Sequence, residues 1–279
     1  MGHGDHWGCF DDDIKELTTG LLLTAVKNGE VTDVGKVRTV WPGKTHEEEG
    51  TVYASDYPAD TDVCFRSLHW IDQDTRTIRL VSWFPMGRVG HLTDVKIRAI
   101  REWELGLEAV IVGSTSDGAE IAFFDTPYFK NSGAYRIGEW QSFSLAGLAY
   151  SVHSAAGSHF IRDDQEQLRQ WYEVMGEEPP RDAGGRILPQ TVSLEGLAAL
   201  VPSDGDWPED CTYSCVVEGL DSFTVEGYKI YSIDTTFLHL EPEVGGILYA
   251  PSRVIEAGYT LKEGDTITGG LWLHGCLCV

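Results

Sequence analysis

The chain has 279 residues, of which 44 are acidic and 21 are basic, so its formal net charge is −23. Hydrophobic residues make up 42% and aromatic residues 11%, which is enough apolar surface for a core and excludes a largely disordered chain. The charge argues against a nucleic-acid partner, because such proteins place lysine and arginine against phosphates. We therefore expect a globular protein of one large or two ordinary domains.

The first predicted elements are a short helical turn and a hairpin. The acidic run 11–13 can begin a helical turn over 12–18. The dipeptide Asn28-Gly29 then predicts a tight turn between 21–26 and 30–34, because both residues tolerate positive φ. The alternative is a helix in which three apolar residues share one face: Ile14, Leu17 and Leu21.

Strands are expected through most of the chain up to residue 150. Apolar and polar residues alternate there, and turn dipeptides such as Asp117-Gly118 separate the runs. The predicted strands are 37–41, 51–53, 63–71, 76–84, 94–100, 105–113, 119–124 and 141–150.

A helix is predicted next. Leu168, Trp171, Tyr172 and Met175 recur at helical spacing, after the acidic pair 163–164 and before a glycine suited to a helix end. We expect this apolar stripe to pack on a sheet. A second, short helix is expected over 194–200, capped by Ser193 and ended by Pro202.

The C-terminal part returns to strands, predicted at 211–218, 222–225, 228–240, 246–250 and 266–278. Two segments, 134–150 and 258–273, share a tyrosine, a glycine-acid turn and an apolar strand rich in small residues. They represent either a duplicated β-module or two unrelated modules with similar turns. The segment 263–273, with its Gly-Asp turn and paired glycines, resembles the closing strands of small OB-type barrels.

The predicted fold is therefore mainly β. It has two β-rich domains, barrel- or sandwich-like, over 1–158 and 203–279, joined by a helical connector at 159–202. The resemblance implies an OB-like C-terminal domain. Such barrels often bind oligonucleotides, yet residues 211–279 contain only three basic residues, Lys229, Arg253 and Lys262, which argues against that role.

The candidates for chemistry are histidines and cysteines, since the sequence has no phosphate-binding glycine loop, nucleophile elbow or His-Glu-x-x-His helix. His69 lies near Asp72 and Asp74 in sequence, and His91 lies in the same strand-rich region, so these residues could act as acid or base. The alternative is that both histidines are half-exposed strand residues.

Four cysteines could hold a structural zinc ion. Cys211 and Cys215 would share one face of a strand, and Cys276 and Cys278 would share one face of another. The alternative is ordinary buried thiols, or a disulfide. The N-terminal residues His3, His6, Cys9 and Asp11 are either a transition-metal site or part of a frayed terminus.

The aromatic residues Trp70, Trp83 and Trp272 are candidates for interaction anchors, with core packing as the alternative. We predict an acidic binding module for a basic protein partner. It would be cytoplasmic, because no secretory signal or membrane-spanning segment is predicted and the thiols are expected to be reduced. The alternatives are a metal-assisted hydrolase that uses histidines and carboxylates, and an inhibitor that mimics nucleic acid.

Overall fold

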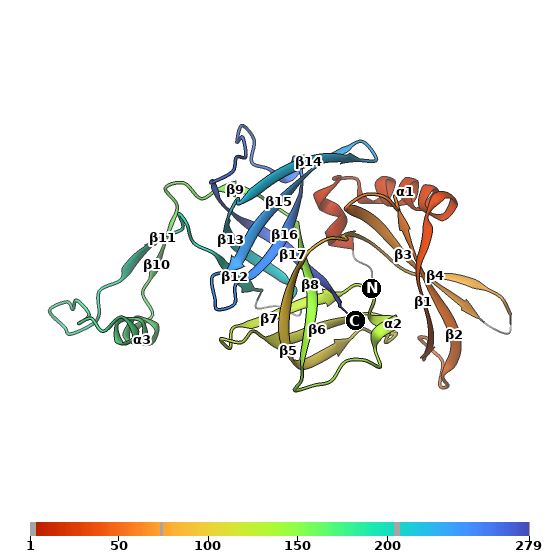
Figure 1. Cartoon of the computed structure of the whole chain (residues 1–279), viewed down its shortest axis with the longest axis horizontal. Coiled ribbons are helices and arrows are strands. Elements are labelled where there is room, and N and C mark those ends of the chain that lie inside the picture. Colours follow the sequence, from red (N-terminus) through yellow and green to blue (C-terminus); the bar gives the residue numbers. More distant parts are fainter. Residues whose placement is uncertain (1–3, 73–74, 204–206, 279) are drawn as a thin grey trace.

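A computed structural model of the chain describes residues 4–72, 75–203 and 207–278. The protein is mainly β, with 51% strand and 14% helix, as the sequence predicts. Figure 1 shows three parts: an N-terminal sheet with a helix, a central set of barrel strands, and an arm that extends away from the rest. Among the described residues, no helix is long and apolar enough to cross a membrane.

The N-terminal part is a four-stranded antiparallel sheet with a helix packed on it. A 3-10 helix (Gly4–Cys9) leads to α1 (Ile14–Asn28). The strands follow in chain order: β1 (Glu30–Thr39), β2 (Glu48–Tyr57), β3 (Val63–Asp72) and β4 (Ile78–Gly87). The buried side chains of α1 are Leu17, Leu21 and Ala25, four residues apart, so one face of the helix covers the sheet.

The predicted hairpin at Asn28-Gly29 is wrong, and residues 14–28 form one continuous helix. The Asp13 side chain caps the helix by accepting a hydrogen bond from the Glu16 amide. Gly29 has φ −70° and donates to the carbonyl of Ala25, so it ends the helix instead of making a turn. A Cβ at Gly29 would lie 2.5 Å from the Ala25 oxygen, which explains why glycine stands there.

Five strands close into a barrel, which confirms a barrel in the predicted fold class. They are β5 (His91–Glu102), β6 (Ala109–Ser114), β7 (Glu120–Asp125), β8 (Trp140–Ala149) and β17 (Thr266–Leu277). The strands β5, β6 and β7 form an antiparallel meander. β17 pairs in parallel with β7 and antiparallel with β8, and β8 pairs with β5 to complete the circuit. The last strand of the chain therefore completes a barrel whose other strands precede residue 150.

A second group of strands repeats part of this pairing pattern. It contains β13 (Asp210–Val216), β14 (Gly219–Val225), β15 (Tyr228–Leu238) and β16 (Val244–Pro251). β13 pairs antiparallel with β17 as β5 does with β8, and β16 pairs in parallel with β8 as β7 does with β17. The two similar sequence segments end in β8 and β17, which thus occupy corresponding positions. The duplicated β-module, the OB-like character and the two-domain division stay predictions.

The arm contains β10 (His159–Arg162), α3 (Gln165–Met175) and β11 (Gln190–Ser193). The predicted helix is confirmed: the Asp164 carboxylate caps its start, and Gly176 ends it with φ 68°. Of its apolar stripe only Leu168 is buried, and the side chain of Met175 is exposed. Trp171 and Tyr172 are half-buried, so the stripe is partly covered.

The predicted helix at 194–200 is wrong. Ser193 instead accepts a hydrogen bond from the Glu195 amide in a turn, and β12 (Ala199–Pro202) follows and pairs with β13. The predicted connector 159–202 thus holds one long helix and three strands. Three short elements complete the chain: α2 (Tyr128–Asn131), β9 (His153–Ser154) and a 3-10 helix (Ser252–Val254).

Candidate functional site

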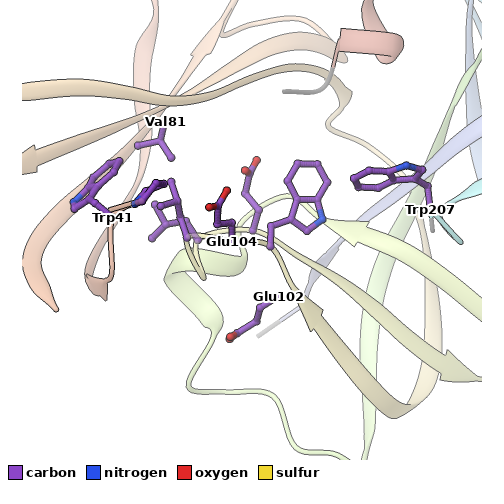
Figure 2. A pocket seen from close by; sticks show the side chains of 10 residues that line it. Trp41, Val81, Glu102, Glu104 and Trp207 are labelled. Carbon is purple, nitrogen blue, oxygen red and sulfur yellow. The ribbon is translucent and has the colours of Figure 1, made fainter. Parts of the chain in front are cut away.

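The candidate site is a cavity of about 420 Å³ between the N-terminal sheet and the barrel. Four separate segments line it: the residues after β1, strand β4, the connection between β5 and β6, and the residues before β13. We call it the tryptophan pocket. It is lined by Trp41, Pro42, Val81, Glu102, Trp103, Glu104, Leu105, Leu107, Glu108 and Trp207. Figure 2 shows Trp41 and Trp207 at opposite ends, with Glu104 between them.

A tight turn between β5 and β6 supplies most of the lining. The Trp103 amide donates to the Glu108 carbonyl, and the Gly106 amide donates to the Trp103 carbonyl. Gly106 has φ 65°, a conformation that glycine adopts without strain. The Thr39 hydroxyl at the end of β1 donates to the Leu105 carbonyl at 2.7 Å. This bond fixes the turn against the N-terminal sheet and holds the two walls of the pocket together.

Aromatic contacts fix the tryptophan rings. Trp103 and Trp207 meet edge to face, with centroids 5.5 Å apart. Trp41 meets the buried Trp70 in the same way at 5.5 Å, and the Arg79 guanidinium lies 4.8 Å from the Trp41 ring centroid. Such pairs restrict ring rotation and so hold the tryptophan rings in place in the pocket wall.

The charged lining of the pocket is entirely acidic among the described residues. Glu108 is buried and accepts a hydrogen bond of 2.6 Å from the Ser82 hydroxyl. Glu102 accepts one from the Tyr128 hydroxyl, and burial together with this carboxylate raises the pKa of Tyr128. Glu104 is exposed and makes no hydrogen bond or ion pair with another described residue. Aromatic rings and a free carboxylate together favour an organic cation.

The predicted acid-base residues do not form one cluster. His69 on β3 has its Nε2 2.8 Å from the Ser67 hydroxyl, and burial lowers its pKa. Asp72 instead accepts a hydrogen bond from the Thr75 amide, and Asp74 lies outside the described residues. His91 on β5 forms an ion pair of 2.9 Å with a carboxylate that sequence proximity did not indicate, that of Asp234 on β15.

The four candidate zinc ligands are not brought together. Cys211 and Cys215 on β13 pair with Leu271 and Ile267 of β17, whereas Cys276 lies further along β17, opposite Ser144. Over residues 4–72, 75–203 and 207–278, no three His, Cys, Asp or Glu side chains are grouped to hold a metal ion. Burial raises the pKa of both β13 thiols to about 12, so they are poor ligands in their present surroundings.

The expectation of a frayed N-terminus is wrong for the described residues. His6, Trp7, Cys9 and Phe10 are all buried. The His6 Nδ1 lies 2.6 Å from the Tyr150 hydroxyl, and the Cys9 thiol donates to the His6 carbonyl. These contacts give both side chains protein partners in place of a metal. His3 lies outside the described residues.

The predicted interaction anchors lie mainly in the core. Trp70 and Trp272 are fully buried, and the half-buried Trp83 stacks on Trp7 at 5.1 Å. Sequence reasoning did not single out Trp41 or Trp207 as site residues. The available signal was their position: each directly precedes a proline, outside a predicted strand interior, where a large ring has less core to enter.

Comparison of the chain with protein-family models, with curated proteins and with solved structures gave no match.

Proposed function

We propose that the protein is an acidic binding module, and that its tryptophan pocket receives a cationic side chain of a basic protein partner. The observation that carries this proposal is the convergence of Trp41, Trp103 and Trp207 with the unpaired carboxylate of Glu104 in one cavity. A cavity of about 420 Å³ accommodates a lysine or arginine side chain with part of its backbone.

Two energetic terms favour such a partner. A cation against a tryptophan face contributes about 0.5 to 2 kcal/mol, more where water is excluded. The net charge of −23 attracts basic molecules over a longer range and accelerates their association at low salt. The partner would meet the protein in the cytoplasm, a proposal supported by the absence of any disulfide among the six cysteines.

Calorimetric titration with a lysine- and arginine-rich peptide tests the proposal. Trp207→Ala should weaken binding about fivefold, which corresponds to about 1 kcal/mol. Glu104→Gln should weaken it to a similar extent, and binding by the unaltered protein should weaken as salt rises. The matched controls are Trp140→Ala, which removes an equally exposed ring elsewhere, and Glu263→Gln. Equal loss in the controls, or affinity that does not respond to salt, would refute the proposal.

A metal-assisted hydrolase is the alternative function, and the His91–Asp234 pair is the observation that favours it. An imidazole held by a carboxylate can act as a general base. Hydrolysis of activated esters by the protein with added zinc, abolished by His91→Ala, would support this alternative. The nucleic-acid-mimicking inhibitor has no comparable observation in its favour and stays a prediction.

A further inference from the structure

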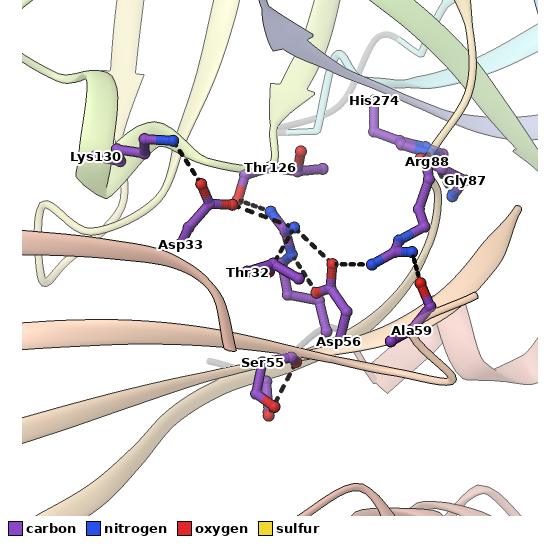
Figure 3. Close-up of polar contacts among 12 residues, drawn as sticks. Thr32, Asp33, Ser55, Asp56, Ala59, Gly87, Arg88, Thr126, Lys130 and His274 are labelled. Carbon is purple, nitrogen blue, oxygen red and sulfur yellow. Dashed lines mark hydrogen bonds and ion pairs between the residues drawn. The ribbon is translucent and has the colours of Figure 1, made fainter. Parts of the chain in front are cut away.

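A second cavity, of about 720 Å³, lies between β1–β4 and the segment that follows β7. It is separate from the tryptophan pocket and shares no lining residue with it. We call it the charged cavity. Its lining includes five charged side chains: Asp33, Asp56, Arg66, Arg88 and Lys130. Figure 3 shows Lys130 reaching from α2 toward Asp33, and Arg88 beside Asp56.

Both carboxylates of this cavity form ion pairs with basic side chains of the protein itself. Asp56 is 1% exposed and accepts two hydrogen bonds from Arg66, at 2.7 and 2.8 Å, and one from Arg88 at 3.0 Å. These arginines hold the pKa of Asp56 below its ordinary value despite its burial. Asp33 lies 2.7 Å from the Lys130 ammonium and 3.4 Å from Arg66. Both acids are therefore already paired at the base of the cavity.

Two of the three cations, Lys130 and Arg88, are more exposed than the acids, whereas Arg66 is buried. The side chain of Lys130 is 49% exposed and that of Arg88 is 24% exposed, against 14% for Asp33. Three positive charges also face two negative ones, so the cavity has an excess of one positive charge in a chain of net charge −23. The Lys130 ammonium uses one of its three N–H donors on Asp33, which leaves donors for a ligand.

We propose that the charged cavity binds a small oxyanion, a phosphate or a carboxylate, at the exposed ammonium of Lys130. Guanidinium and ammonium groups form short, charge-assisted hydrogen bonds with both kinds of anion. The polar residues Asn131 and Thr126 also line the cavity.

Thermal unfolding tests whether the cavity binds an oxyanion. Inorganic phosphate or succinate replaces chloride in separate titrations, and the ionic strength is kept constant. We expect the midpoint of the unaltered protein to rise with one of the two anions, which identifies whether phosphate or carboxylate is preferred. Lys130→Gln should need at least about fivefold more of that anion for the same rise, as expected on losing a charged hydrogen bond. Lys44→Gln is the control, because Lys44 is equally exposed and is also ion-paired.

A chemical readout does not depend on stability. Cys276 lines the charged cavity, and apart from the exposed Cys278 the other four cysteines are buried. In a Cys278→Ser variant, the bound anion should slow alkylation of Cys276, and adding Lys130→Gln should remove that protection. A midpoint and an alkylation rate that respond to neither anion would overturn the proposal. So would equal responses of the Lys130→Gln variant and its parent.

Discussion

Replacing Asp125 by asparagine should stabilise the protein at alkaline pH. Asp125 is the last residue of β7 and is fully buried. Its Oδ2 accepts a hydrogen bond from the Tyr135 hydroxyl, but its Oδ1 has no partner among the described residues. Burial raises the pKa of this carboxyl from its ordinary 3.8 to about 7, because the charged form loses its water.

The sign follows from comparing the two states of the chain. Below pH 3.8 the carboxyl is protonated in both states, and its contribution to stability is fully present. As the pH rises, the unfolded chain ionises first, so stability is lost progressively until the pH exceeds the folded value of about 7. The rise in pKa to about 7 corresponds to a total loss of about 4 kcal/mol. Asparagine does not titrate and can still accept the bond from Tyr135, so the variant avoids this loss.

The assay is urea unfolding of both proteins at pH 4.5 and at pH 8.5. Between these two values, the stability of Asp125→Asn relative to the unaltered protein should rise by about 3 kcal/mol. Other buried acids, such as Glu209, contribute equally to both proteins and cancel in the difference. Tyr135→Phe should act in the opposite direction, since it removes the bond that stabilises the charged carboxylate. Parallel stability curves for Asp125→Asn and the unaltered protein would refute the reasoning.

Two further predictions concern stability. Arg66→Met should lower the free energy of unfolding by about 3 to 5 kcal/mol, because it leaves a buried carboxylate short of its main partner. Arg38→Met is the control, because Arg38 forms an exposed ion pair with Glu49. In the same urea assay it should lower the free energy of unfolding by less than about 1 kcal/mol. Equal losses for Arg66→Met and Arg38→Met would contradict the prediction. Gly269→Ala should lower the free energy of unfolding by about 1 to 3 kcal/mol, as measured by thermal unfolding, because the added Cβ would overlap the Ser151 carbonyl. Gly270→Ala meets only ordinary contacts, and an equal loss there would show that packing is not the cause.

Local signals in the sequence determined the elements they belong to. The helix at 165–175 was predicted from its own apolar spacing, and its caps at Asp164 and Gly176 lie within the same short segment. The turn at Asp117-Gly118 is likewise present between β6 and β7, with Gly118 at φ 84°. These features depend on residues a few positions apart, whose backbone preferences act without help from the rest of the chain.

The Asn28-Gly29 turn shows where local preference was overridden. The dipeptide favours a hairpin, but a helix through residue 28 buries Leu17, Leu21 and Ala25 against the sheet. Burying each of the two leucines contributes about 1.5 to 3 kcal/mol, which exceeds the preference of a turn dipeptide. The sheet that provides this burial is formed by residues 30–87, so the decision could not be read from residues 14–29 alone.

The candidate sites were decided by tertiary structure. The sequence alone indicates a mainly β protein with a large acidic excess. Strand alternation can be recognised over a few neighbouring residues, and net charge follows from counting residues. The sequence does not indicate that Trp41, Trp103 and Trp207 line one pocket, or that the carboxylate beside His91 is Asp234. Alternation states which face a residue occupies but not which strand lies next to it. That choice depends on how all the strands together bury their apolar faces, and it brings the last strand of the chain beside β7 and β8.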